Sequence, residues 1–121
     1  MAKLVFDYPF MAKDYKLKKE IIYIGRQNTN DITIPDYIYF KDLSESTQRL
    51  YLDSLMKVSR IHARITKKND GWYIEDIGTN GLGSQYGTYV NMARIEVKKP
   101  YKLVNNDEIR FGAIVCKFVE D

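Results

Sequence analysis

The sequence predicts an all-β protein, an antiparallel β-sandwich of short strands with a short helical insertion at about 42–57. Three observations predict it. Apolar and polar residues alternate in several short segments, as in strands that are buried on one face. Turn-forming residues separate these segments. The 121 residues also include ten Tyr and five Phe, and aromatic side chains favour strands over helices.

The expected strands follow one another at short intervals along the chain. The clearest alternation is that of Ile61, Ala63 and Ile65, which share one face of a strand. The Asn-Asp-Gly sequence at 69–71 then indicates a tight turn, and hence a β-hairpin. The expected strands are 3–6, 21–24, 32–34, 61–66, 72–77, 88–91, 101–104, 108–111 and 114–119. Many short strands with polar turns are typical of an antiparallel sandwich.

The segment 35–57 breaks this pattern, and we expect it to be an insertion between two strands. Asp42 can cap a helix, and Glu45, three residues later, can complete a capping box. A rough apolar stripe with helical spacing consists of Leu43, Leu50, Leu55 and Met56. These features predict one helix. Its position in the chain places it near the same rim as the loops described below, where it shapes the ligand groove or contacts a partner. The alternative is a neutral addition that packs on the flank of the sandwich.

Length and composition indicate one domain over 1–121. The net charge of +3 is too small to indicate a nucleic-acid partner, although it suits an anion held at one spot. With a single Cys and a single His, neither an intrachain disulfide nor a Cys/His zinc site can form. No apolar run resembles a signal peptide or a membrane span. We therefore expect a cytoplasmic protein without cofactor, metal or membrane insertion.

Three loop segments carry groups that suit a phosphate. Gly25 ends an expected strand and lets the chain turn sharply, which places Arg26 in the following loop. Arginine is the side chain best shaped to bind a phosphate through two parallel hydrogen bonds. Ser59 and Arg60 come just before another strand and add a hydroxyl group, loop amides and a second cation. A turn at Gly87 leads into a third strand, so all three segments can meet at one end of a rigid sandwich.

Ser59, His62 and Asp76 match a hydrolase triad by residue type alone. The chain has no nucleophile elbow and no α/β pattern, so we do not expect an enzyme. The better interpretation of His62 is a partly buried side chain that hydrogen-bonds loop backbone and holds the binding loops together.

Taken in order, these motifs resemble the forkhead-associated (FHA) domain family over 21–119. They are Gly25-Arg26, Asp31, Ser59-Arg60-Ile61-His62-Ala63, Asp76-Ile77, Gly87-Thr88-Tyr89-Val90-Asn91, Asn106-Asp107-Glu108-Ile109 and Phe111-Gly112. The resemblance implies an eleven-stranded sandwich whose rim loops bind phosphothreonine on a partner protein. It implies that Arg26 and Ser59 bind the phosphate with a contribution from Arg60. The architectural positions that it implies are Gly25, His62, Gly87, Thr88 and Asn91.

The stretch 76–88 departs from the family pattern, in which an asparagine before Gly-Thr binds the peptide backbone. One alignment puts Tyr86 at that position, but a tyrosine has no amide. The other uses Asn80, in a tight Asn-Gly turn, with Thr79 near the phosphate and 82–86 as an extra flap over the groove. We favour the second alignment.

The resemblance leaves two functions open. The first is a phosphothreonine-binding module of a larger signalling protein or complex. The second is a degenerate FHA fold that serves as a phosphate-independent scaffold. Such a scaffold would be expected to have lost the residues that bind phosphate, whereas Arg26 and Ser59 are present here. The sequence therefore favours phosphopeptide binding.

Overall fold

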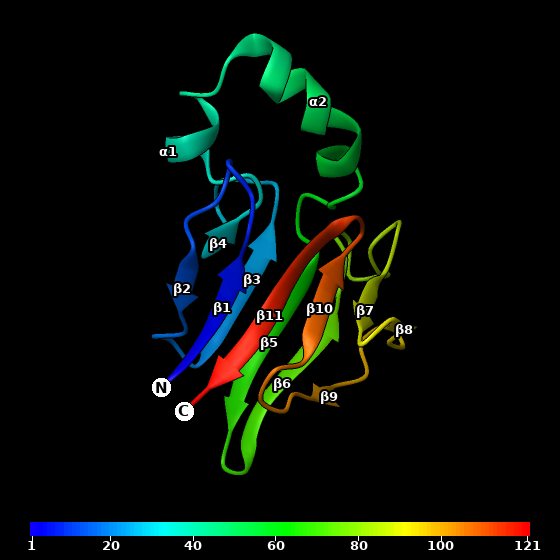
Figure 1. Ribbon diagram of the computed structural model, residues 1–121. Coiled ribbons are helices and arrows are strands. Elements are labelled where there is room, and N and C mark those ends of the chain that lie inside the picture. The colour runs from blue at the N-terminus through cyan, green and yellow to red at the C-terminus, as the bar shows by residue number, and fades with distance from the viewer.

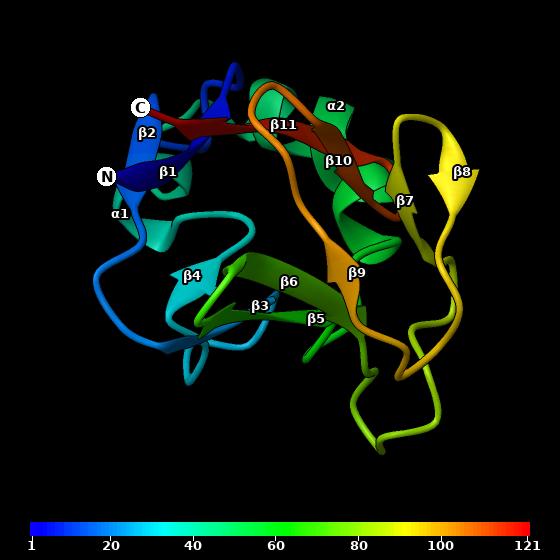
Figure 2. The same cartoon turned by 90° about the horizontal axis from the view of Figure 1, so that it is seen from below.

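The computed structural model describes residues 1–121 and shows two sheets packed face to face (Figures 1 and 2). One sheet has the order β2-β1-β11-β10-β7-β8 and the other β4-β3-β5-β6-β9, and only the β3–β4 pair is parallel. The strands are β1 (Ala2–Phe6), β2 (Asp14–Lys16), β3 (Ile21–Gly25), β4 (Ile32–Thr33), β5 (Ala63–Lys68), β6 (Gly71–Asp76), β7 (Thr88–Val90), β8 (Ala93–Arg94), β9 (Tyr101–Lys102), β10 (Glu108–Phe111) and β11 (Ile114–Glu120). The predicted eleven-stranded sandwich is confirmed.

All nine strands expected from alternation are present, to within two residues at either end. The two that alternation did not reveal are β2 and β8, which lie at the edges of one sheet. Both are short, and each pairs with a single neighbour along a few residues. An edge strand with little buried surface needs no apolar face, so its sequence has no period to detect.

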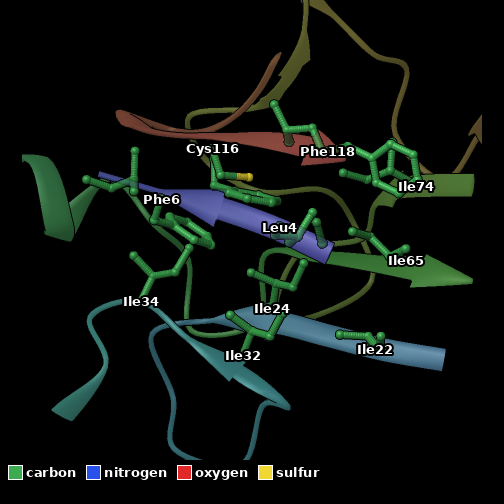
Figure 3. Packing of buried hydrophobic residues seen from close by; sticks show 14 of the residues in the cluster. Leu4, Phe6, Ile22, Ile24, Ile32, Ile34, Ile65, Ile74, Cys116 and Phe118 are labelled. Atoms are coloured by element: carbon green, nitrogen blue, oxygen red, sulfur yellow. The ribbon is translucent and has the colours of Figure 1, made fainter. Parts of the chain in front are cut away.

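The inner faces of the two sheets form one core of 24 buried apolar residues. Leu4 and Phe118, from β1 and β11, meet Ile24, Ile65 and Ile74 from the opposite sheet (Figure 3). Each of these five side chains is fully buried, and burial of such a side chain contributes about 1.5–3 kcal/mol. This core holds the two sheets together, so the loops at the sandwich end are carried on a rigid support.

The insertion between β4 and β5 contains two helices rather than one, and both lie at the same end of the sandwich (Figure 1). They are α1 (Tyr37–Phe40), capped by Asp36, and α2 (Glu45–Met56), capped by Ser44. Neither has the length and apolar character that a membrane-spanning helix needs. The expected Asp42 cap is wrong, because Asp42 still belongs to the turn after α1. The Ser44 Oγ atom accepts the Thr47 N–H at 3.1 Å, and Glu45 instead pairs with Arg49.

The apolar stripe expected on the long helix is confirmed for two of its four residues. Leu55 is buried and Leu43 is half-buried against the core, but Leu50 and Met56 are exposed. The helix also packs through Tyr51, whose ring centre lies 5.1 Å from that of Phe10 in an edge-on contact. Only one end and one side of α2 therefore touch the sandwich, and the rest of the helix faces solvent.

Candidate functional site

One open pocket of about 350 Å³ lies among the loops at the end of the sandwich nearest the C-terminus of α2. It is lined by Arg26, Met56, Ser59, Arg60, Thr79, Asn80, Leu82, Gly83, Gln85 and Tyr86. The six residues that the sequence suggested as ligand contacts all belong to this group, although they come from three separate segments of the chain. The structure therefore brings the expected phosphate and peptide contacts together in one place.

The pocket has a strong positive character. Arg26 and Arg60 line it, no lining residue is acidic, and neither arginine forms an ion pair in the protein. The Nε–H of Arg26 donates to the Val58 carbonyl at 2.5 Å, which orients the guanidinium of this half-buried residue. Its two terminal nitrogens donate to no protein acceptor. Two cations without counter-charge at one site favour an anionic ligand.

The two segments that carry these arginines are clamped together. The backbone N–H of Arg26 donates to the Ser59 carbonyl at 3.1 Å, and the Asn30 amide donates to the Arg60 carbonyl at 2.8 Å. A Cβ atom on Gly25 would collide with the Arg60 carbonyl. The chain bends directly after Gly25, as expected, but Gly25 itself does not have a positive φ. A glycine is needed here because the neighbouring backbone passes so close.

The Ser59 hydroxyl is oriented toward the pocket by the loop opposite. Its Oγ atom accepts the Gln85 N–H at 3.3 Å, so one lone pair of the oxygen is used and its own proton is free to be donated. The Ser59 amide is not free, because it donates to Nδ1 of His62 at 3.0 Å. The sequence also suggested that backbone amides of this loop bind the phosphate. The backbone N–H of Arg60 donates to no protein acceptor. The hydroxyl and this amide can therefore both donate to an anion.

His62 lies fully buried beneath the pocket and joins two of its loops. Since Nδ1 accepts the Ser59 N–H, the ring proton must be on Nε2, which donates to the Gly87 carbonyl at 2.9 Å. Burial lowers the pKa of His62, against a smaller raising effect of the Gly87 hydrogen bond and of Asp76. The imidazole is therefore neutral at physiological pH and serves as a cross-link between loops.

The triad suggested by residue type does not form. His62 contacts the amide of Ser59 rather than its hydroxyl, and its other nitrogen faces a carbonyl. Asp76 hydrogen-bonds Ser84 and Thr88 rather than His62. The three side chains are not linked to one another by hydrogen bonds as a nucleophile, a base and an orienting acid would be. They have instead the arrangement of a scaffold beneath a binding surface.

The stretch 76–88 is anchored by Asp76, which is buried at the end of β6. Its carboxylate accepts the Ser84 N–H at 2.6 Å, the Ser84 hydroxyl at 2.5 Å and the Thr88 hydroxyl at 2.8 Å. Ser84 is itself buried, and its oxygen accepts the Gly87 N–H at 3.0 Å. The segment 82–86 is thus a fixed wall of the pocket, not the flap over a groove that the sequence suggested.

The turn before this wall contains Asn80, which the favoured alignment expects to bind the peptide backbone. The Gly81 N–H donates to the Gly78 carbonyl at 3.3 Å, which closes a turn with Thr79 and Asn80 at its tip. The Thr79 oxygen accepts the Ile61 N–H at 3.3 Å, and Asn80 is exposed with no protein partner for its amide. Asn80 and Tyr86 both line the pocket, so both alignments place their residue at the same surface.

The remaining architectural candidates lie at opposite ends of β7. Gly87 has φ +90°, a conformation that favours glycine, and Thr88 is fully buried on Asp76. Asn91 lies at the far end of the strand, where its amide donates to Asp107 and its oxygen accepts the Glu108 N–H, both at 2.9 Å. Asn91 therefore joins two turns away from the pocket, while Gly87 and Thr88 support the pocket itself.

A sequence model of the FHA domain family matches residues 22–112, which is well over half of the chain. The chain belongs to the FHA domain family. The match includes both arginines of the pocket, Ser59, His62 and the whole of the 76–88 stretch. The resemblance recognised in the sequence is therefore confirmed.

Known proteins agree with this assignment. The FHA domain is 42% identical over 60 residues to dma1 of Schizosaccharomyces pombe, a probable E3 ubiquitin-protein ligase; the match covers 46% of this chain and 21% of that protein. The chain thus spans about a fifth of that relative. The FHA domain of the CT664 protein of Chlamydia trachomatis matches with a TM-score of 0.69 at 22% identity, over 99% and 97% of the two chains. EmbR of Mycobacterium tuberculosis, in complex with a low-affinity phosphopeptide, matches with a TM-score of 0.66 at 25% identity, over 98% of this chain and 24% of EmbR.

Two supports of the FHA pocket were missed by sequence reasoning. Ser84 has no apolar period or motif around it, and only the fold shows that it is buried against Asp76. Asn30 lies between Arg26 and Asp31 in the quoted motif, yet its role depends on how closely the Arg60 backbone approaches. A single sequence does not show which polar side chain of a polar loop is buried.

The neutral, buried state of His62 predicts that this FHA domain loses stability in mild acid. The folded pKa lies below the ordinary value of 6.5, so between the two values only the unfolded chain binds a proton. The stability that depends on a neutral His62 is fully present above pH 6.5 and is lost as pH falls through 6.5 toward the folded pKa. In this range the free energy of unfolding falls by at most about 1.4 kcal/mol per pH unit. Denaturant unfolding at pH 7.5, 6.5 and 5.5 measures it.

The His62→Gln variant is the control for this pH dependence, because it removes the only histidine of the chain. Its unfolding free energy is expected to vary less between pH 5.5 and 7.5 than that of the unchanged domain. An equal pH slope in the two proteins would show that another group is responsible.

Proposed function

We propose that this FHA domain is a phosphopeptide-binding module that recognises phosphothreonine on a partner protein. One observation carries the proposal. Arg26, Arg60 and Ser59, all without acidic partners, line one open pocket. A phosphate is a dianion with several acceptor oxygens, so it can use all of these donors at once. The family is among those that read phosphorylated motifs through arginines.

The rest of the pocket is suited to the peptide around the phosphate. The Asn80 amide, which is exposed and unpaired, can donate to a peptide carbonyl and accept from a peptide N–H. The Thr79 hydroxyl proton is free, because the Thr79 oxygen acts as acceptor for Ile61. We assign Arg26, Ser59, Arg60 and Thr79 to the phosphate and Asn80 to the peptide main chain.

The binding event would serve phosphorylation-dependent assembly in a larger signalling protein or complex. The EmbR structure contains a phosphopeptide, and the dma1 relative is much longer than the FHA segment that it shares. A domain that binds its partner only when that partner is phosphorylated is useful when it is joined to, or recruited by, other domains.

The alternative is a phosphate-independent scaffold, and a direct binding experiment separates the two. Calorimetry with a library of phosphothreonine peptides and the same peptides without phosphate is the measurement. We expect some phosphorylated peptides to bind and their unphosphorylated versions not to bind. Failure of every phosphorylated member to bind would reject phosphopeptide recognition in favour of the scaffold.

Asn80→Ala is expected to weaken phosphopeptide binding by about 1–3 kcal/mol, because it leaves peptide main-chain groups without partners in the complex. Tyr86→Ala is expected to weaken binding less, since a tyrosine cannot both donate to and accept from a peptide main chain in the way an amide does. Calorimetry on both variants measures this. The opposite order of effects would assign the backbone contact to Tyr86.

Phosphothreonine is expected to bind more tightly than phosphoserine in an otherwise identical peptide. The threonine methyl group would enter a small apolar niche, and burial of one methyl group contributes roughly 1 kcal/mol. A matched peptide pair titrated against the unchanged domain measures the difference. Equal affinities would show that no such niche exists in this domain.

A further inference from the structure

Three large apolar side chains line the pocket and are left exposed by the rest of the protein. They are Met56, the last residue of α2, and Leu82 and Tyr86 from the anchored wall. Their exposed fractions are 55%, 83% and 44%. They belong to two parts of the chain that are far apart in sequence, yet all three line the same pocket as Arg26.

Both parts are held in place by contacts of their neighbours. Leu55 is buried in the core beside Met56, and the N–H of Val58 donates to the Leu55 carbonyl at 3.0 Å, so the end of α2 is tied to the sandwich. On the other side, Ser84 is buried on Asp76, between Leu82 and Tyr86. Met56 and Leu82 are therefore presented from fixed backbone rather than from loose loops.

An exposed apolar side chain by itself is ordinary, whereas several around one polar pocket mark a binding surface. The pocket here combines a cationic part, Arg26 with Arg60, and an apolar part. Lys57, whose Nζ atom lies 6.0 Å from the centre of the Tyr86 ring, adds a third cation beside it. A ligand that fits both parts has an anionic group and a large apolar side chain a short distance away.

We propose that the pocket contains an apolar subsite, formed by Met56 and Leu82 with the Tyr86 ring, that takes a large apolar side chain close to the phosphothreonine of the ligand. This inference rests on the proposed function, because the phosphate contact places the peptide. It assigns a binding role to the α1–α2 insertion, which supplies one wall of the subsite through Met56. The preferred ligands are phosphothreonine peptides with Leu, Ile, Met or Phe near the phosphorylated residue.

The test uses an otherwise polar phosphothreonine peptide in which leucine is placed, one position at a time, on either side of the phosphothreonine. Affinities are measured by fluorescence anisotropy. At the best position, leucine is expected to increase affinity for the unchanged domain about tenfold, as burial of one apolar side chain allows. In the Met56→Ser, Leu82→Ser double variant, this preference is expected to fall to about threefold or less. The preference for leucine is the ratio of the affinities of the leucine-containing and the all-polar phosphopeptide, so each protein serves as its own reference.

Leu50→Ser is the matched control, since Leu50 is an exposed leucine of the same helix that does not line the pocket. This variant should keep the full preference for leucine. If the polar phosphopeptide binds but leucine helps at no position, or helps equally in the double variant, the apolar subsite is rejected and the proposed function stands. If no phosphopeptide binds at all, the proposed function and the subsite are both rejected.

Discussion

Arg26→Ala is expected to weaken phosphothreonine-peptide binding at least about tenfold, or about 1.4 kcal/mol, without unfolding the domain. The Arg26 guanidinium has both terminal nitrogens free, and its Nε–H is held by the Val58 carbonyl. It is therefore oriented for a phosphate before the ligand arrives, and its loss removes charge-assisted hydrogen bonds that a mobile surface cation would not make. Calorimetry gives the affinity and denaturant unfolding checks the fold.

Arg49→Ala is the control for this experiment. Arg49 is an exposed arginine on α2 that pairs with Glu45 and does not line the pocket, so the variant makes the same change in net charge. We expect its affinity for the phosphopeptide to remain close to that of the unchanged domain. Equal losses in the two variants would indicate a general electrostatic attraction rather than a site at Arg26, and an unchanged Arg26→Ala affinity would reject the site.

Asp76→Ala is expected to destabilise the domain by about 3 kcal/mol, the largest stability effect that we predict. The buried carboxylate accepts three hydrogen bonds, from the Ser84 amide, the Ser84 hydroxyl and the Thr88 hydroxyl. Without it, buried donors are left without partners and the wall 82–86 loses its anchor. Denaturant unfolding at constant pH measures the loss, and phosphopeptide affinity is expected to fall with it.

Two comparison variants isolate the cause. Asp76→Asn keeps the shape and one carbonyl oxygen, so we expect a smaller loss than for alanine. Asp53→Ala removes an exposed carboxylate from α2 and is expected to change the unfolding free energy by no more than about 0.5 kcal/mol. If Asp76→Ala unfolds at the same denaturant concentration as Asp53→Ala, the hydrogen bonds of Asp76 do not stabilise the fold.

The insertion shows where prediction from sequence reached its limit. Its location between two strands and its helical character were both predictable, because Pro35 and the run of polar and helix-forming residues differ from the alternating strands around them. The capping residue and the buried face were not. Asp36, Asp42 and Ser44 are all good caps, and only packing against Tyr8 and Phe10 selects Tyr51 as the contact.

The sequence by itself determined the sandwich and six of the ten residues that line its pocket. Strand alternation is a local property, and motifs such as Gly25-Arg26 and Ser59-Arg60 carry their chemistry with them. The tertiary structure alone decided which groups are free and which are used. The His62 tautomer, the burial of Ser84 and the presence of Met56 in the same pocket as Arg26 each depend on contacts between segments distant in the chain. Such contacts are set by the packing of the whole core, which no local pattern records.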